Sequence, residues 1–125
     1  MRYIAKYLIM TSFLAVAMAG CYYDEVVVFK KLPVNVSLKN DLMPIFNQSC
    51  NTGGCHDLEG SNSPSLVADR AYESLVYGSM INTLEPEKSI LYQQIVTGAM
   101  PPSGPLTSNE QKIILAWITE GARNN

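Results

Sequence analysis

The stretch Cys50-Asn51-Thr52-Gly53-Gly54-Cys55-His56 gathers two thiols and an imidazole into one short segment. The whole chain of 125 residues has three cysteines and one histidine. A site that needs two imidazoles from one chain is therefore excluded. Thiolates and imidazoles are good ligands for soft and borderline metals, so this segment is the main candidate for a binding site.

Two ordinary interpretations of these residues stay open. Cys50 and Cys55 could form a disulfide in an exported protein, which leaves His56 without a role. Cys50, Cys55 and His56, with Asp57, could instead bind zinc. A zinc site of this kind would take all its ligands from one loop, because no second Cys/His pair occurs elsewhere in the chain.

Two cysteines followed at once by a histidine also resemble the haem-attachment motif of c-type cytochromes. In that family each thiol forms a thioether with a haem vinyl group, and the histidine binds the iron on the proximal side. The resemblance implies one covalently bound haem c. Cys50 and Cys55 would hold it, and His56 would be the proximal iron ligand.

The spacing departs from the usual motif, which has two residues between the cysteines where this chain has four. On a regular helix, positions three apart differ by about 60° around the axis and positions five apart by about 140°. Both thiols therefore cannot face one haem edge from a regular helix. The spacer must bulge, and Gly53-Gly54 supplies the freedom because glycine tolerates positive φ.

A six-coordinate haem needs a second ligand, commonly the thioether of a methionine. The candidates are Met43, Met80 and Met100. Met100 precedes Pro101-Pro102, and proline restricts both its own φ and the residue before it. A methionine followed by proline before the last helix also resembles the distal-ligand segment of class I cytochromes. Met100 is the predicted distal ligand, with Met80 as the second choice.

The apolar pattern after Ser37 predicts four short helices. The first carries Leu38, Leu42, Ile45 and Phe46, with Pro44 at a first turn or kink. The others are capped by Asp69, begin at Pro86, and begin at Thr107 with Glu110 completing a capping box. Gly78, Gly98 and Gly121 end these three helices, and Asn124-Asn125 is expected to fray.

Residues 38–123 resemble the small single-haem cytochrome domains of bacterial lipoproteins. The resemblance implies an all-α domain over 38–125, wrapped around one haem. Phe46 and Trp117 would then contact the haem or the crossing of the terminal helices, or belong to an ordinary aromatic core.

The N-terminus predicts export. Arg2 and Lys6 precede an apolar run over 7–19, which is shorter than the roughly 20 residues of a membrane span. Ala17-Met18-Ala19-Gly20-Cys21 resembles a bacterial lipobox. This implies a signal peptide over 1–20 that is cleaved, a lipid on Cys21, and a tether over 21–37. The protein would be anchored in the bacterial cell envelope, on a periplasmic or outer-surface face.

The formal net charge is −2, and it becomes −4 when Arg2 and Lys6 leave with the signal. The absence of a basic stripe argues against nucleic-acid binding. No acid/base pair or nucleophile array is visible, so no small-molecule substrate is assigned. The prediction is an electron carrier that cycles between Fe(III) and Fe(II) and docks on redox proteins. Alternatives are a haem with an open distal site, for gas binding or weak peroxidase activity, and a haem-free, disulfide-stapled binding module.

Overall fold

A computed structural model describes residues 31–57 and 62–125. The predicted signal peptide and the predicted lipidation site Cys21 lie outside the described residues. Residues 31–125 form one compact unit. Every residue of the predicted haem site falls within this unit.

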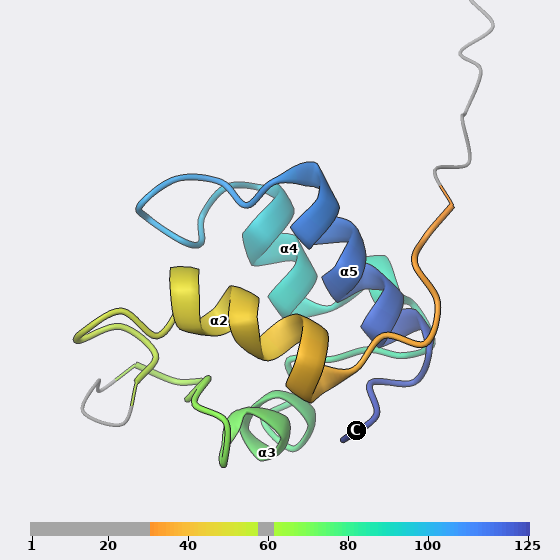
Figure 1. Cartoon of the computed structure of the whole chain (residues 1–125), viewed down its shortest axis with the longest axis horizontal. Coiled ribbons are helices and arrows are strands. Elements are labelled where there is room, and N and C mark those ends of the chain that lie inside the picture. Colours follow the sequence, from red (N-terminus) through yellow and green to blue (C-terminus); the bar gives the residue numbers. More distant parts are fainter. Residues whose placement is uncertain (1–30, 58–61) are drawn as a thin grey trace, which may run out of the picture. The chain divides into compact units, whose positions relative to one another are not determined.

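The described residues are helical, and no strand occurs among them. The elements in chain order are η1 (Leu38–Leu42), α2 (Met43–Ser49), α3 (Ala71–Val76), η2 (Pro86–Lys88), α4 (Ile90–Val96) and α5 (Ser108–Thr119). The predicted all-α class is confirmed. In Figure 1, α2 lies between α3 and the pair formed by α4 and α5.

The first helical segment changes its pitch between Leu42 and Met43, just before Pro44. Residues 38–42 form a π-helical turn, in which the N–H of Leu42 donates to the carbonyl of Ser37 (3.2 Å). An α-helix continues from Met43, with Pro44 in its first turn. Proline has no N–H to give to the preceding turn, so the change of pitch falls where that bond is missing anyway. The predicted helix is confirmed, with Pro44 in a first turn.

The last helix begins as predicted. The Thr107 hydroxyl accepts from the N–H of Glu110 (3.3 Å), and a Glu110 carboxylate oxygen accepts from the N–H of Thr107 (2.7 Å). Gly121 follows the helix with φ +94°, a conformation that favours glycine. The predicted capping box and terminator are both confirmed.

Two other helix starts differ from the prediction. Asp69 does not cap α3, because Arg70 occupies the N-cap position and no side chain makes a capping bond there. Pro86 starts only a single 3₁₀ turn. Ser89 then leaves helical geometry (ψ 133°), and its buried hydroxyl accepts from the N–H of Asn82 (2.9 Å). This bond to a preceding loop separates η2 from α4.

Helix α5 is the centre of the core and packs against η1, η2 and α4. Trp117 on α5 and Phe46 on α2 are fully buried. The Trp117 indole N–H donates to the carbonyl of Arg123 (2.8 Å), so the ring is buried without an unpaired donor. The other fully buried large side chains are Leu42, Leu75, Ile114 and Ile118.

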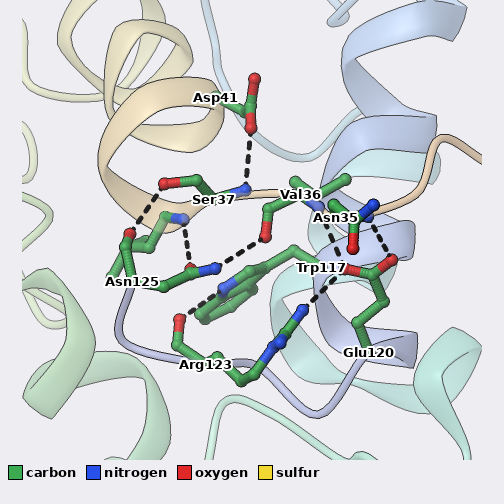
Figure 2. Close-up of polar contacts among 9 residues, drawn as sticks. Asn35, Val36, Ser37, Asp41, Trp117, Glu120, Arg123 and Asn125 are labelled. Carbon is green, nitrogen blue, oxygen red and sulfur yellow. Dashed lines mark hydrogen bonds and ion pairs between the residues drawn. The ribbon is translucent and has the colours of Figure 1, made fainter.

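The segment before η1 packs on the C-terminal end of α5. Leu32 contacts the core and Val36 is buried, although both fall in the segment expected to be a tether. Figure 2 shows the polar contacts that hold this segment. The N–H groups of Asn35 and Val36 donate to the two carboxylate oxygens of Glu120 (2.7 and 3.0 Å).

The last residue joins the same contacts. The Asn125 carbonyl accepts from the Ser37 hydroxyl (2.8 Å) and the N–H of Lys39 (3.0 Å). Its side-chain oxygen accepts from the N–H of Leu38 (3.1 Å). The expectation that Asn124-Asn125 frays is therefore wrong for Asn125, because the unpaired N–H groups at the start of η1 use it as a cap.

Glu120 makes the packing of this segment sensitive to pH. The N–H of Asn35 lowers the pKa of Glu120, and the N–H of Val36 and the charge of Arg123 act in the same direction. Because the folded-state pKa lies below that of the unfolded chain, the carboxylate stabilises the fold above the unfolded-state pKa. This contribution is lost as the pH falls through the folded-state value. Glu120→Gln is therefore expected to lower the unfolding temperature at neutral pH.

The comparison is made by thermal unfolding of both proteins between neutral and acidic pH, and the two curves should converge in acid. Glu85→Gln is the matched control, because it removes one acidic charge from an exposed pair with Lys88 that bonds no backbone N–H. A difference between Glu120→Gln and the native protein that persists unchanged in acid would contradict the prediction.

Candidate haem-binding cavity

One cavity brings together the residues that the sequence predicts for the site. Its volume is about 480 Å³, within the range of small-molecule and cofactor sites. Cys50, Cys55, His56, Met80 and Met100 all line it. Apolar side chains make much of the remaining wall, namely Leu66, Leu75, Ile90, Leu91, Ile95, Pro101 and Pro102.

Several elements contribute to this cavity. In Figure 1 the loop between α4 and α5, which carries Met100, lies on the same side as the C-terminal end of α2, which leads to Cys50. Met43, the third candidate methionine, is buried in the core and does not line the cavity. Phe46 and Trp117 are fully buried and do not line it either.

Cys50 lies at the end of α2, where its N–H donates to the carbonyl of Phe46 (2.8 Å). Burial raises the pKa of its thiol to about 11, and the neighbouring Cys55 and Glu110 act in the same direction. The Cys50 thiol is therefore protonated at neutral pH and supplies no thiolate nucleophile there.

The four-residue spacer leaves the helix and forms a turn. The N–H of Cys55 donates to the carbonyl of Thr52 (2.9 Å), and Gly54 has φ +81°. There is open space beside Gly54 for a side chain. Glycine is therefore needed there for its positive φ and not for lack of room. The predicted bulge is confirmed, with Gly54 taking the positive φ.

The turn is held at Gly54 from both sides. Its N–H donates to the Asp57 carboxylate (3.0 Å), and its carbonyl accepts from the Asn62 amide (3.2 Å). Asp57 therefore acts on the spacer backbone. The turn brings His56 back beside the end of α2, where its N–H donates to the carbonyl of Cys50 (3.2 Å).

The His56 ring is oriented by one strong contact. Its Nδ1 lies 2.7 Å from the carbonyl oxygen of Pro64. A carbonyl only accepts, so Nδ1 carries the proton in this contact and the neutral ring has its lone pair on Nε2. A histidine that binds a metal through one nitrogen usually donates from the other to a carbonyl or carboxylate. His56 has this arrangement.

Met80 and Met100 differ in exposure. Met100 is 39% exposed, and its N–H donates to the carbonyl of Gln94 (3.0 Å). Met80 is half-buried against the core and is bonded on both sides of its backbone, to Leu75 (3.0 Å) and to Leu91 (3.2 Å). Both thioethers line the cavity, so the choice between them as a distal ligand stays a prediction.

The two ordinary interpretations can be compared with this geometry. Cys50 and Cys55 are free thiols in the structure. Over residues 31–57 and 62–125, no group of three His, Cys, Asp or Glu side chains is arranged to hold a metal ion.

Some residues of the site carry no sequence signal. Pro64 contributes a backbone carbonyl, which is independent of its side chain. The apolar wall residues are indistinguishable from core residues in the sequence. Asn51 lies between the two cysteines in the sequence, but its contact with the carbonyl of Leu66 depends on the path of the following loop.

Comparisons of the chain with protein-family models, with curated proteins and with solved structures found no match. Among the helices of the described part of the chain, none combines the length and the apolar character needed to cross a membrane.

Proposed function

We propose that the protein is an electron-transfer cytochrome of the c type, with one haem attached covalently through Cys50 and Cys55. The observation that carries the proposal is the convergence of both thiols, the only imidazole of the chain and two thioethers on one largely apolar cavity. Three of these groups come from one motif and the thioethers from distant loops.

The residues are of the types that a covalently bound haem needs, and the ring of His56 is already held in one orientation. Two thiols are needed for two thioether bonds, and His56 has its Nδ1 bonded to Pro64 and its Nε2 free to bind a metal. Met100 or Met80 offers a soft sulfur on another wall of the cavity. When bound, haem c supplies an iron that alternates between Fe(III) and Fe(II).

The chain contributes three things to electron transfer. Cys50 and Cys55 fix the position of the group, and the contact with Pro64 keeps the imidazole in one orientation. The apolar wall excludes water and disfavours the state of higher charge. The partial exposure of Met100 leaves one side of the cavity accessible for docking of a redox protein.

The second part of the proposal concerns where the protein is located, and it rests on the N-terminal residues. We infer from the lipobox resemblance that Cys21 carries lipid and that the domain is anchored in the bacterial cell envelope. The acidic charge of the mature chain favours basic redox partners, through a long-range attraction that salt screens.

The test is expression of the full chain in a bacterium with a c-type haem maturation system, followed by a haem-stained denaturing gel. Only covalently bound haem survives denaturation, so a stained band at the mass of the chain is expected. Colourless protein would overturn the proposal, and a mass two hydrogens below that of the dithiol chain would then favour the disulfide-stapled module.

A second candidate function is binding of a diatomic gas at an open distal site. The 39% exposure of Met100 favours it, because an exposed loop can withdraw its side chain from the cavity. Carbon monoxide binding to the reduced protein tests it.

A further inference from the structure

Asn51 connects the end of α2 to a segment fifteen residues later. Its side-chain amide nitrogen donates to the carbonyl of Leu66 (2.7 Å) and to the side-chain oxygen of Asn47 (2.9 Å). Its own side-chain oxygen is buried and has no partner among the described residues. A reversed amide would place oxygen against the Leu66 carbonyl, so the contacts require this orientation.

The segment that Asn51 holds is the one that orients His56. Pro64 accepts from the His56 ring (2.7 Å), and the N–H of buried Leu66 donates to the His56 carbonyl (2.8 Å). Residues 64–66 are thus bonded to His56 at both ends and to Asn51 at Leu66. Asn51 and His56 are also joined through the chain by the bond from the His56 N–H to the Cys50 carbonyl.

We propose that Asn51 is a positioning residue for the His56 imidazole: its amide fixes Leu66, and thereby the distance from the Pro64 carbonyl to His56 Nδ1. A buried oxygen without a partner is unfavourable, and such local costs are retained where a group has a functional role. The proposal rests on the proposed haem function for its redox consequence, but its structural part concerns only residues of this chain.

The consequence follows from the basicity of the ring. A short bond from Nδ1–H to a carbonyl makes Nε2 a stronger electron donor, which favours the oxidised state of a bound metal. Loss of the Asn51 contact lets residues 64–66 move and weakens that bond. The Nδ1 proton then exchanges faster with water, and the reduction potential of the loaded protein rises.

The experiment compares Asn51→Leu with Asn47→Leu. Both changes replace an amide by an apolar side chain of similar size, and they lie one helical turn apart. Asn47→Leu removes only the exposed partner of Asn51 and leaves the contact with Leu66 in place. Asn51→Gln restores an amide donor on a longer side chain and serves as the rescue variant.

Two quantities are measured. The exchange rate of the His56 Nδ1 proton is measured by ¹⁵N-edited NMR. It is expected to rise about tenfold in Asn51→Leu, because the net free energy of one hydrogen bond corresponds to a factor of about that size. The reduction equilibrium of the haem-loaded protein is expected to change about threefold toward Fe(II), or about 28 mV at 59 mV per tenfold for one electron. Asn47→Leu should leave both unchanged, and Asn51→Gln should recover part of each.

The outcomes separate this inference from the proposed function. Equal exchange rates in the native protein, Asn51→Leu and Asn47→Leu overturn the role of Asn51, whether or not haem is attached. Absence of covalent haem from the native protein overturns the proposed function and leaves the exchange measurement valid. If Asn51→Leu does not accumulate, Asn51→Ala, which also removes the donor to the Leu66 carbonyl, takes its place. Equal exchange rates in the native protein, Asn51→Ala and Asn47→Leu then overturn the inference.

Discussion

Replacing Cys50 and Cys55 together by alanine is expected to leave an exported protein with no haem stain above background on a denaturing gel. The thioether bonds need a sulfur at both positions, and no other thiol lines the cavity. His56 and the methionines would still offer axial ligands, so haem added to the purified variant binds only reversibly. The expected loss of covalent attachment is complete. Each single variant should keep one thioether and a reduced stain.

The third cysteine supplies the control for this experiment. Cys21→Ser removes the same kind of atom from a position outside the described residues. It should keep full haem stain while releasing the protein from the membrane fraction, because the proposed lipid is attached there. A double variant that stains as strongly as the native chain would show that Cys50 and Cys55 do not hold the group.

The local features of the fold are predictable where one residue type has one physical reason to be present. Thr107 and Glu110 form the capping box because their side chains satisfy N–H groups that no helix can satisfy internally. Gly54 takes a positive φ in the spacer because it has no Cβ. The capping contact spans three residues and the positive φ belongs to one, so a short stretch of sequence contains everything that each feature needs.

The contacts between distant segments are not predictable in this way. Fraying is the natural expectation for Asn125, because its partners, Ser37 and Leu38, lie more than eighty residues earlier. Ser89 interrupts the helix expected after Pro86 because its hydroxyl bonds to Asn82 in a loop. In both cases a polar side chain is used by backbone groups whose position depends on the folded chain.

The candidate site is predictable from the sequence in part. Cys50, Cys55 and His56 are neighbours in the sequence, and their spacing is enough to identify them together. A short motif favours Met100, which does line the same cavity, but Met80 lines it as well. The carbonyl of Pro64 is invisible at this level, because a backbone oxygen carries no sequence signal.

Met100→Ala is expected to leave covalent haem attachment unchanged and to open the distal side of the haem. The oxidised protein should lose the weak long-wavelength absorption band that methionine sulfur gives to a c-type haem. The reduced protein should bind carbon monoxide more tightly, because no internal ligand competes. If the native protein has its distal position open for 0.1 to 10% of the time, the gain in apparent affinity is about 10- to 1,000-fold.

Met80→Ala is the matched control, since it makes the same truncation on the same cavity. Met80 is half-buried against the core, so its loss should lower stability by about 1–2 kcal/mol, less than the cost of truncating a fully buried methionine, without changing the oxidised spectrum. Met100 is more exposed and contributes less to the core, so its effect should fall on the spectrum and on carbon monoxide binding. The reverse pattern, with the band lost in Met80→Ala and retained in Met100→Ala, would assign the distal position to Met80. An unchanged spectrum in both variants, with tight carbon monoxide binding by the native protein, would mean that no thioether occupies that position and that the gas-binding function is the correct one.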